Sequence, residues 1–222
     1  MPDTFVVLFD LQPADINNDG KTDLVTSYGI SPVSGDGATW TVFAVLKNTG
    51  DHNTVTFETI LLDPKRDINK LSIGDLDGDG YPDLVTSDEF DEQLDIRRNM
   101  STEARIQFSD PEGVFFQNDI IISTRVTDVN NDGKADIMML SGNGPTVLKN
   151  RSVSGRIDFS APRILSDDRL FTELIMPPIV EDVDGDGFPE ILAREEEDFI
   201  VIENLSNHDE IRFNERVHRF SI

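Results

Sequence analysis

Apolar residues along this chain fall in short runs that polar or glycine-rich segments separate. In Arg105–Phe108 and Arg156–Phe159, apolar and polar side chains alternate. Such alternation puts the apolar side chains on one face and is typical of a half-buried strand. No segment combines a helical period with helix caps; the acidic run Arg194–Asp198 resembles a helix start, but its equivalents elsewhere are hairpin turns. The pattern therefore predicts an all-β chain.

The predicted strands come in four sets of four. The first strands are Phe5–Leu11, Ile68–Ile73, Ile120–Val126 and Leu174–Val180. The second strands are Leu24–Thr26, Leu84–Thr86, Ile137–Met139 and Ile191–Ala193. The third strands are Val42–Lys47, Leu94–Arg98, Thr146–Lys149 and Ile200–Glu203. The fourth strands are Val55–Ile60, Arg105–Phe108, Arg156–Phe159 and Glu210–Phe213.

Two markers show that these sets are repeats. An acidic ten-residue loop joins the first strand of each set to the second, and successive loops start 60, 53 and 54 residues apart. After each third strand, an asparagine is followed nine residues later by a phenylalanine, in the pairs Asn48/Phe57, Asn99/Phe108, Asn150/Phe159 and Asn204/Phe213. Repeats of about 50 residues in an all-β chain predict the four-stranded blades of a β-propeller. The expected units are 1–62, 63–112, 113–164 and 165–222, within a single repeat domain.

Four repeats are compatible with a closed four-bladed ring, with part of a larger propeller, or with a half completed by a second copy. Three of the repeat asparagines also match the N-glycosylation pattern, in Asn99–Ser101, Asn150–Ser152 and Asn204–Ser206. We instead expect the repeat asparagine to adopt a positive φ in the hairpin after strand three.

The acidic loops predict metal binding. Each loop has an oxygen-bearing side chain at positions 1, 3, 5 and 9, and a glycine at position 6 that allows a left-handed turn. All-oxygen ligands in a flexible protein cage suit Ca²⁺ better than Mg²⁺, so about four calcium sites are expected. The predicted side-chain ligands are Asp15, Asn17, Asp19, Asp23, Asp75, Asp77, Asp79, Asp83, Asp128, Asn130, Asp132, Asp136, Asp182, Asp184, Asp186 and Glu190. The backbone carbonyls of Lys21, Tyr81, Lys134 and Phe188, at position 7, are expected to complete the sites.

An EF-hand starts in the same way but needs a glutamate at position 12 and flanking helices. Position 12 is Thr26, Thr86, Met139 or Ala193 here, and a predicted strand starts at position 10. The residue at position 9 must therefore close the ligand shell, and the loop is interpreted as a brace between strands.

Charge supports this interpretation. The net charge is −24, with 43 acidic and 19 basic residues, and fourteen of the acidic residues lie in the four loops. Such a charge opposes binding to nucleic acid or to an anionic membrane, and it favours bound cations. With no cysteine, no disulfide can staple the fold. No segment is apolar enough to predict a membrane span, and Met1–Thr4 lacks the basic and apolar regions of a secretory signal.

The loop motif and the Asn–Phe segment resemble the FG-GAP or VCBS-type repeats of the integrin α-subunit propeller and of many bacterial secreted and surface proteins. The resemblance covers nearly the whole chain. It implies a β-propeller whose loops bind calcium, and an extracellular or cell-surface location. The Phe-Gly and Gly-Ala-Pro signatures of that family are missing, and Ser160–Pro162 is the nearest match.

We expect a non-catalytic binding or adhesion protein whose partner is a protein or a glycan, with a homo-oligomer possible. The alternatives are a lectin-like propeller and a propeller module of a polysaccharide-degrading enzyme. No catalytic residues are predicted, because the three histidines do not combine with a nucleophile or with one another. The long glycine-rich turn Tyr28–Trp40 is the candidate ligand-binding element, with Tyr28 and Trp40 as its aromatic platforms. Alternatively, Trp40 packs between blades.

Overall fold

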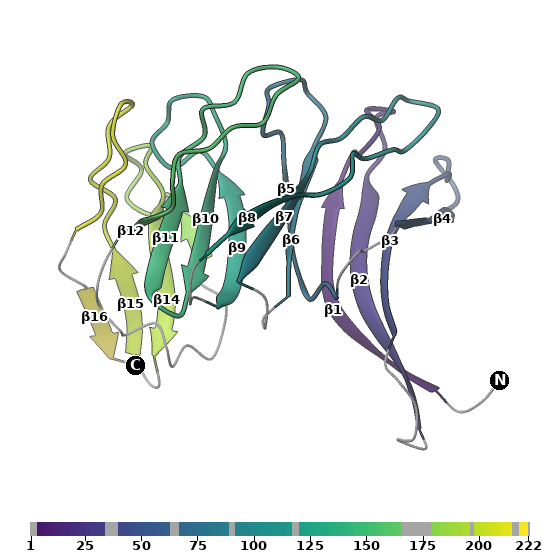
Figure 1. Cartoon of the computed structure of the whole chain (residues 1–222), viewed down its shortest axis with the longest axis horizontal. Coiled ribbons are helices and arrows are strands. Elements are labelled where there is room, and N and C mark those ends of the chain that lie inside the picture. Colours follow the sequence, from purple (N-terminus) through teal and green to yellow (C-terminus); the bar gives the residue numbers. More distant parts are fainter. Residues whose placement is uncertain are drawn as a thin grey trace. The chain divides into compact units, whose positions relative to one another are not determined.

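The computed structural model describes residues 4–33, 40–62, 67–88, 92–116, 120–165, 179–195, 198–214 and 218–221. These residues form strands, turns and bends, without a helix (Figure 1). Accordingly, this part of the chain contains no helix with the length and hydropathy needed to cross a membrane.

Sixteen strands form four sheets of four, and we call these sheets blades 1 to 4. Blade 1 contains β1 (Thr4–Ala14), β2 (Asp23–Pro32), β3 (Trp40–Asn48) and β4 (Phe57–Leu62). Blade 2 contains β5 (Lys70–Gly74), β6 (Asp83–Ser87), β7 (Gln93–Arg97) and β8 (Glu112–Phe115). Blade 3 contains β9 (Ile121–Thr127), β10 (Asp136–Ser141), β11 (Gly144–Leu148) and β12 (Arg163–Ile164). Blade 4 contains β13 (Ile179–Glu181), β14 (Glu190–Glu195), β15 (Asp198–Ile202) and β16 (His218–Ser221).

Each strand pairs with its neighbours in the sequence, and the described registers are all antiparallel. Each sheet is therefore a four-stranded meander, the form of a propeller blade. The all-β prediction with four-stranded blades is confirmed.

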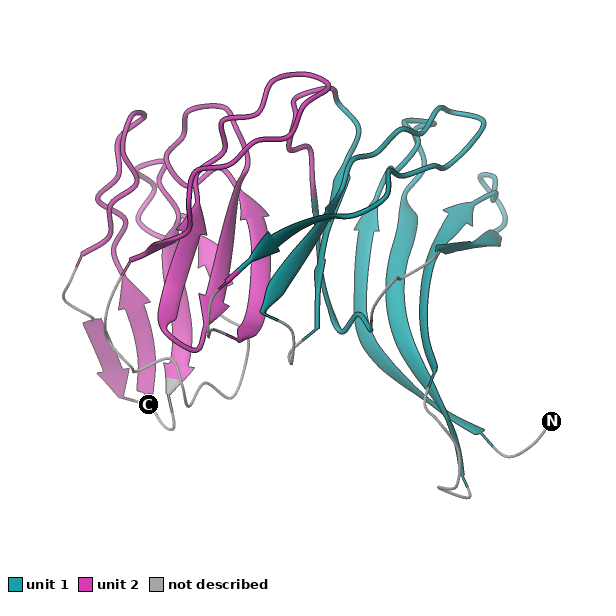
Figure 2. Ribbon diagram, viewed as in Figure 1, with its two compact units in different colours: residues 1–73, 80–115 teal, residues 74–79, 116–222 magenta. Residues whose placement is uncertain are grey.

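The chain divides into two compact units (Figure 2). Unit 1 contains residues 1–73 and 80–115, and unit 2 contains residues 74–79 and 116–222. Blade 1 and most of blade 2 belong to unit 1, whereas blades 3 and 4 belong to unit 2.

The core of unit 1 forms where blades 1 and 2 pack face to face. Its buried side chains are Ile16, Val25, Phe43 and Val45 from blade 1, and Ile68, Leu71, Leu84 and Ile106 from blade 2. Ile16 stands at position 2 of the first loop, so the loop itself contributes an apolar side chain to this core.

The core of unit 2 has the same plan. Its buried side chains are Val129, Met138, Leu140 and Val147 from blade 3, and Ile191, Ala193, Ile200, Ile202, Ile211 and Phe213 from blade 4. Val129 is again at position 2 of its loop. The repeat therefore specifies a blade together with its packing on the next blade.

The predicted fourth strands are wrong in three of the four blades. β4 overlaps the prediction, but β8, β12 and β16 begin four or five residues after the repeat phenylalanine. The Asn–Phe segments form isolated bridges instead, in the pairs Asn99↔Phe108, Asn150↔Phe159 and Asn204↔Phe213. Side chains such as Ile106 and Ile211 in these segments face the core, and this packing produces the alternation that predicts a strand.

The predicted positive φ of the repeat asparagine is also wrong. Among the described residues other than glycine, a positive φ occurs at Asn18 and Asn131. The repeat asparagine is instead a hydrogen-bonding centre. In blade 2, Asn99 Nδ2 donates to Pro82 O in its own loop and to Ile16 O in the loop of blade 1, both at 2.8 Å. Asn99 Oδ1 accepts from Ser101 N at 2.8 Å.

The same contacts recur in unit 2. Asn150 Nδ2 donates to Leu76 O and Ala135 O, and Asn204 Nδ2 donates to Val129 O and Pro189 O. Each amide thus joins its own loop to position 2 of the preceding loop.

Asn99 and Asn48 form a matched pair for testing this role. Asn99→Ala leaves the buried Ile16 O and the partly buried Pro82 O without their donor, and we expect a loss of about 2–4 kcal/mol in the free energy of unfolding. Asn48 Nδ2 donates to the exposed Thr22 O. Asn48→Ala should therefore cost only about 1 kcal/mol. Urea unfolding measures both, and equal losses would contradict the bridging role.

Candidate metal-binding loops

Each acidic loop turns twice through left-handed backbone. Position 6 is a glycine with a positive φ in every loop, for example 86° at Gly80, as predicted. Position 4 is left-handed too, with φ of 55° at Asn18 and 73° at Gly78. Asparagine and glycine tolerate this conformation better than other residues, which explains why only these two types occupy position 4. This second turn was not predicted from the sequence, although the restriction of position 4 to asparagine and glycine is visible there.

Backbone N–H groups orient the carboxylates at positions 1 and 5. Asp15 Oδ1 and Oδ2 accept from Asp19 N (3.1 Å) and Gly20 N (2.8 Å), and Asp128 repeats both contacts in the third loop. Asp19 Oδ1 accepts from Lys21 N at 3.0 Å. These contacts hold several negative charges close together inside a tight turn.

The carboxylate at position 9 connects the loop to strand three. Asp136 Oδ1 accepts from Asn150 N (2.7 Å), and Oδ2 accepts from Val129 N (3.1 Å). Asp23 makes the same two contacts in blade 1. Glu190, one methylene longer, accepts the equivalent hydrogen bond from Asn204 N at 3.4 Å, so this hydrogen bond to the end of strand three is weaker.

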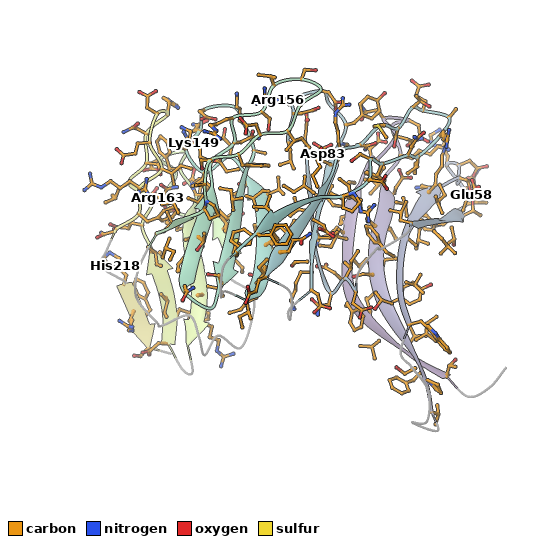
Figure 3. All side chains as sticks on the ribbon, in the orientation of Figure 1. Glu58, Asp83, Lys149, Arg156, Arg163 and His218 are labelled. Atoms are coloured by element: carbon orange, nitrogen blue, oxygen red, sulfur yellow. The ribbon has the colours of Figure 1, made fainter. Side chains whose placement is uncertain are left out.

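Three carboxylates converge in the second and fourth loops. One oxygen each of Asp75, Asp77 and Asp83 lie within 4.8 Å of one another, all within one nine-residue stretch of chain (Asp83 is labelled in Figure 3). Asp182, Asp184 and Glu190 make the same arrangement in the fourth loop. These are positions 1, 3 and 9, three of the four predicted side-chain positions.

The first and third loops carry asparagine at position 3. Asn17 and Asn130 are completely buried, and the Oδ1 atom of each has no hydrogen-bond partner in the structure. A buried carbonyl oxygen without a partner is costly, and a cation ligated by that oxygen would remove the cost. The donor set of all four loops therefore fits a hard cation such as calcium.

Hairpins of the following blade cover position 3 in three loops. Asn17 Nδ2 donates to Glu103 O (2.6 Å), Asn130 Nδ2 donates to His208 O (2.5 Å), and Asp77 Oδ2 accepts from Gly155 N (2.8 Å). In the fourth loop, all residues from Asp182 to Gly187 are exposed. The fourth site is thus the most open to solvent.

Lysines add contacts that were not predicted from the sequence. At position 7, Lys21 Nζ donates to Gly50 O and Lys134 Nζ donates to Ser152 O, each at 2.8 Å. Lys149, labelled in Figure 3, adds an ion pair, with its Nζ 3.3 Å from Asp132 Oδ2. These ammonium groups tie the loop to the hairpin of its own blade and offset part of its charge.

Burial perturbs two of the position-9 carboxyls. Burial raises the pKa of Asp136 to about 6, against the opposing hydrogen bonds from Asn150 N and Val129 N. Burial likewise raises the pKa of Asp23, and the neighbouring Asp19 and Asp15 carboxylates add to the rise. A bound cation would oppose both effects, since it favours the ionised carboxylate.

The predicted aromatic residues lie on a hairpin. Tyr28–Pro32 belong to β2 and Trp40 begins β3, so the long turn predicted over Tyr28–Trp40 is wrong at both ends, while its centre, 34–39, lies outside the described residues. Ile30 pairs with Trp40 and Tyr28 pairs with Val42, which places all four side chains on one face of blade 1. Trp40 is largely exposed, and Tyr28 is half-buried.

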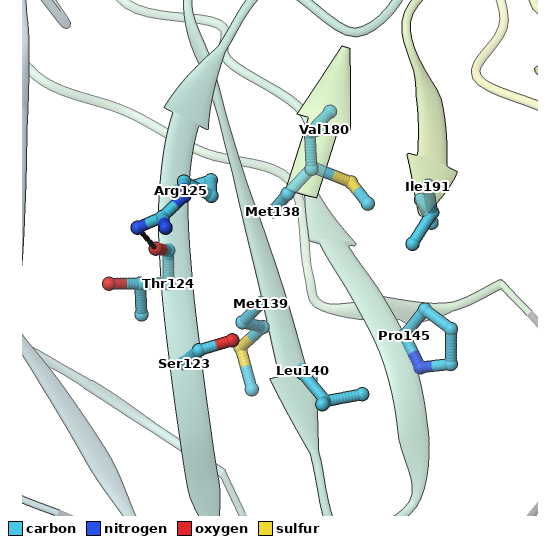
Figure 4. Close-up of a pocket in the computed structure, with 9 residues that line it drawn as sticks. All are labelled: Ser123, Thr124, Arg125, Met138, Met139, Leu140, Pro145, Val180 and Ile191. Carbon is cyan, nitrogen blue, oxygen red and sulfur yellow. Dashed lines mark hydrogen bonds between the residues drawn. The ribbon is translucent and has the colours of Figure 1, made fainter. Parts of the chain in front are cut away.

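A cavity in unit 2 is too small for a sugar. It measures about 10 Å³, close to the space of a single water molecule. Its lining, shown in Figure 4, comes from β9, β10, β11, Val180 and Ile191 and includes Met138, Met139 and Leu140. It is a packing gap between blades 3 and 4.

The loops and blades agree with a known repeat family. A model of the FG-GAP-like repeat matches residues 15–86 and 128–193, more than half of the chain. The chain belongs to the FG-GAP-like repeat family. Each matched segment begins at the first aspartate of an acidic loop and ends on the second strand of the following repeat, so the FG-GAP match covers all four loops.

A solved structure shows a similar fold. It is of an Agrocybe aegerita lectin that recognises non-reducing terminal N-acetylglucosamine, with a TM-score of 0.57 and 16% identity. The match covers 95% of this FG-GAP chain and 65% of the lectin chain, so the chain spans just under two thirds of the lectin's length. At this identity the likeness concerns the fold alone. No curated protein matches the chain.

The raised pKa of Asp136 predicts a pH dependence without metal. Between about pH 4 and pH 6, the folded protein holds a proton on Asp136 that the unfolded chain, with the ordinary pKa of 3.8, has released. The contribution of this group to folding stability therefore falls as pH rises through that window, by at most about 3 kcal/mol.

Chemical unfolding at several pH values in a chelator, with wild type and Asp136→Asn, measures this contribution. The asparagine mimics the protonated acid, so the stability difference between the two proteins should change between pH 4 and pH 6. A difference that stays constant over this range would refute the assignment.

Proposed function

We propose that this chain is a calcium-braced, non-catalytic binding propeller that acts outside the cell. The observation that carries the proposal is the common donor set of the four loops. Loops 2 and 4 gather three carboxylates, and loops 1 and 3 combine carboxylates with the buried, partnerless amide oxygens of Asn17 and Asn130. The same backbone turns present these donors in all four repeats.

Calcium suits these loops better than magnesium. The candidate ligands come from one short loop and are all oxygen, whereas magnesium needs near-ideal octahedral geometry and keeps several waters. Neutral asparagine at position 3 and the exposed fourth loop favour modest affinity. Calcium-binding modules outside the cell typically bind in the range of about 10⁻⁴–10⁻³ M, which supports an extracellular or cell-surface location.

A structural role for the ion follows from what the loop connects. Position 9 contacts the repeat asparagine, and position 2 contributes to the core at Ile16 and Val129. A cation that neutralises the loop would stabilise the junction of strands one, two and three together. Binding of the partner would then use other surfaces of the blades, in adhesion or surface recognition of a protein or a glycan.

The absence of catalysis is part of the proposal. Among the described residues, His208 Nδ1 contacts Asn131 O, and His218 Nε2 lies 3.2 Å from Glu203 Oε1. Neither geometry pairs a histidine with a nucleophile. The many carboxylates in the loops are assigned to cation binding rather than to acid–base chemistry.

Calcium should raise the melting temperature. At a calcium concentration of about 100 times Kd, each filled loop adds about 2.7 kcal/mol, so several loops together should raise Tm by about 10 °C or more. Differential scanning calorimetry with calcium and with a chelator measures this shift. An identical melt in both solutions would reject the calcium brace.

A loop variant and a matched control variant test whether calcium binds at the loop itself. Asp186→Asn removes one carboxylate from position 5 of the fourth loop, whereas Glu58→Gln removes the same charge from an exposed site on β4 (Figure 3). Calorimetric titration should show about one calcium site fewer in Asp186→Asn and no change in Glu58→Gln. Equal effects would mean that net charge, not the loop, governs binding.

A second candidate function is carbohydrate binding. The solved lectin of similar fold recognises terminal N-acetylglucosamine, and Trp40 presents an exposed aromatic ring of the kind that stacks on sugars. If Trp40 is such a platform, a glycan array should show selective binding that Trp40→Ala abolishes. If no glycan on the array binds, or if selective binding persists in Trp40→Ala, Trp40 is not a sugar-binding residue.

A further inference from the structure

Blade 4 exposes the apolar positions that blades 1 and 3 bury. In the core of unit 1, blade 1 contributes Ile16 at loop position 2 and Val25 at position 11. It also contributes Phe43 and Val45, which stand five and three residues before the repeat asparagine. In blade 4 the same positions are Val183, Leu192, Phe199 and Val201. Val183 is 53% and Phe199 50% exposed, and the other two are half-buried. We call these four residues the tail face.

Blade 1 exposes the complementary positions. Blades 2 and 4 pack on blades 1 and 3 with three apolar positions: loop position 10 and the residues seven and nine after the repeat asparagine. In blade 4 these residues are Ile191, Ile211 and Phe213. In blade 1 the same positions are Leu24, Val55 and Phe57. Val55 is 83% and Phe57 39% exposed.

Trp40 extends this surface. The β2–β3 register pairs Leu24 with Leu46 and Ile30 with Trp40, so Leu24 and Trp40 lie on the same side of blade 1. The indole is 57% exposed. We call Leu24, Trp40, Val55 and Phe57 the head face.

The two groups of the hydrogen bond that joins neighbouring blades are also present, one at the head face and one at the tail face. Inside unit 1, the repeat asparagine Asn99 donates to the position-2 carbonyl of Ile16; inside unit 2, Asn204 donates to Val129 O. At the head face the corresponding donor is Asn48, and at the tail face the corresponding carbonyl is that of Val183. In the part of the chain that is described, neither group makes this inter-blade bond.

We propose that the tail face of one copy of this chain docks on the head face of a second copy and reproduces the packing that joins blade 1 to blade 2 and blade 3 to blade 4. The contact is heterologous, because two different surfaces meet, and each copy carries both of them. Its groups are apolar side chains and backbone partners, so it does not depend on the calcium proposal.

A second copy fits these faces because the complementarity is position by position. Val183 takes the place of Ile16, Phe199 that of Phe43, and Val55 that of Ile106, each apolar in every case. Exposed apolar side chains gathered on one face of a sheet are typical of interaction sites. The net charge of −24 opposes association of two copies, so added salt should strengthen the contact.

Two variants separate the two faces. Trp40→Asp with Val55→Asp breaks the head face. Phe199→Asp breaks the tail face together with Ile179→Asp, because Ile179 pairs with Leu192 and so borders the tail face. All four substituted residues are at least half exposed, so folding should persist, and circular dichroism checks it. Analytical ultracentrifugation in calcium and 0.5 M salt, at about 1–200 μM, measures mass.

Wild type should exceed the 24.8 kDa of one copy as its concentration rises. Each variant alone should stay at one copy, because neither has both faces intact. An equimolar mixture of the two variants should form a two-chain complex. Wild type that remains at one copy over the whole range would overturn the proposal, and so would wild type that associates while the mixed variants do not.

The emission of Trp40, the single tryptophan, gives a second readout that needs no variant. Its maximum should shift to shorter wavelength as wild type is concentrated, because the indole leaves water. An unchanged maximum during a rise in mass would place the contact elsewhere and would also overturn the proposal.

Discussion

The hydrogen bonds of the repeat asparagine hold successive blades together. Its side-chain amide has two hydrogens, and in blades 2, 3 and 4 these satisfy one carbonyl in the same blade and one in the preceding loop. The contact to the carbonyl in the preceding loop is buried in all three blades, so a residue without this amide would leave that carbonyl unsatisfied. The backbone N–H of the same residue contacts the carboxylate at position 9. A single residue therefore couples loop, blade and neighbouring blade.

The loops add an electrostatic constraint to this geometry. Their tight left-handed turns and N–H contacts direct several carboxylates toward one another, and burial raises the pKa of Asp136 and Asp23. Like charges held this close favour either protonation or a cation. At neutral pH a bound cation would be the better solution, and the partnerless amide oxygens of Asn17 and Asn130 would provide ligands that protons cannot use. If the loops bind calcium as proposed, stability and metal binding would depend on the same atoms.

The sequence predicted most of the local structure and less of the long-range structure. The loop positions, the left-handed glycine and the first three strands of blades 1 to 3 follow from short-range patterns such as Asp75–Leu84, and the structure agrees. In blade 4 the second and third strands agree as well, whereas the predicted first strand, Leu174–Val180, lies outside the described residues except for its last two positions. The role of the repeat asparagine could not be predicted, because Asn99 and its partner Ile16 are 83 residues apart in the chain. The fourth strands were misplaced because Ile106 and Phe108 alternate with polar residues as they pack on the core shared with blade 1, and in blade 2 this segment forms only an isolated bridge.

The most direct test of the calcium brace is a crystal structure from calcium-containing solution, with anomalous data collected at long wavelength. The account predicts an anomalous peak in each of the four loops, within about 2.3–2.6 Å of the oxygens at positions 1, 3, 5 and 9 and of the carbonyl at position 7. Loops without such peaks at saturating calcium, or peaks bound to acidic residues outside the loops, would contradict it.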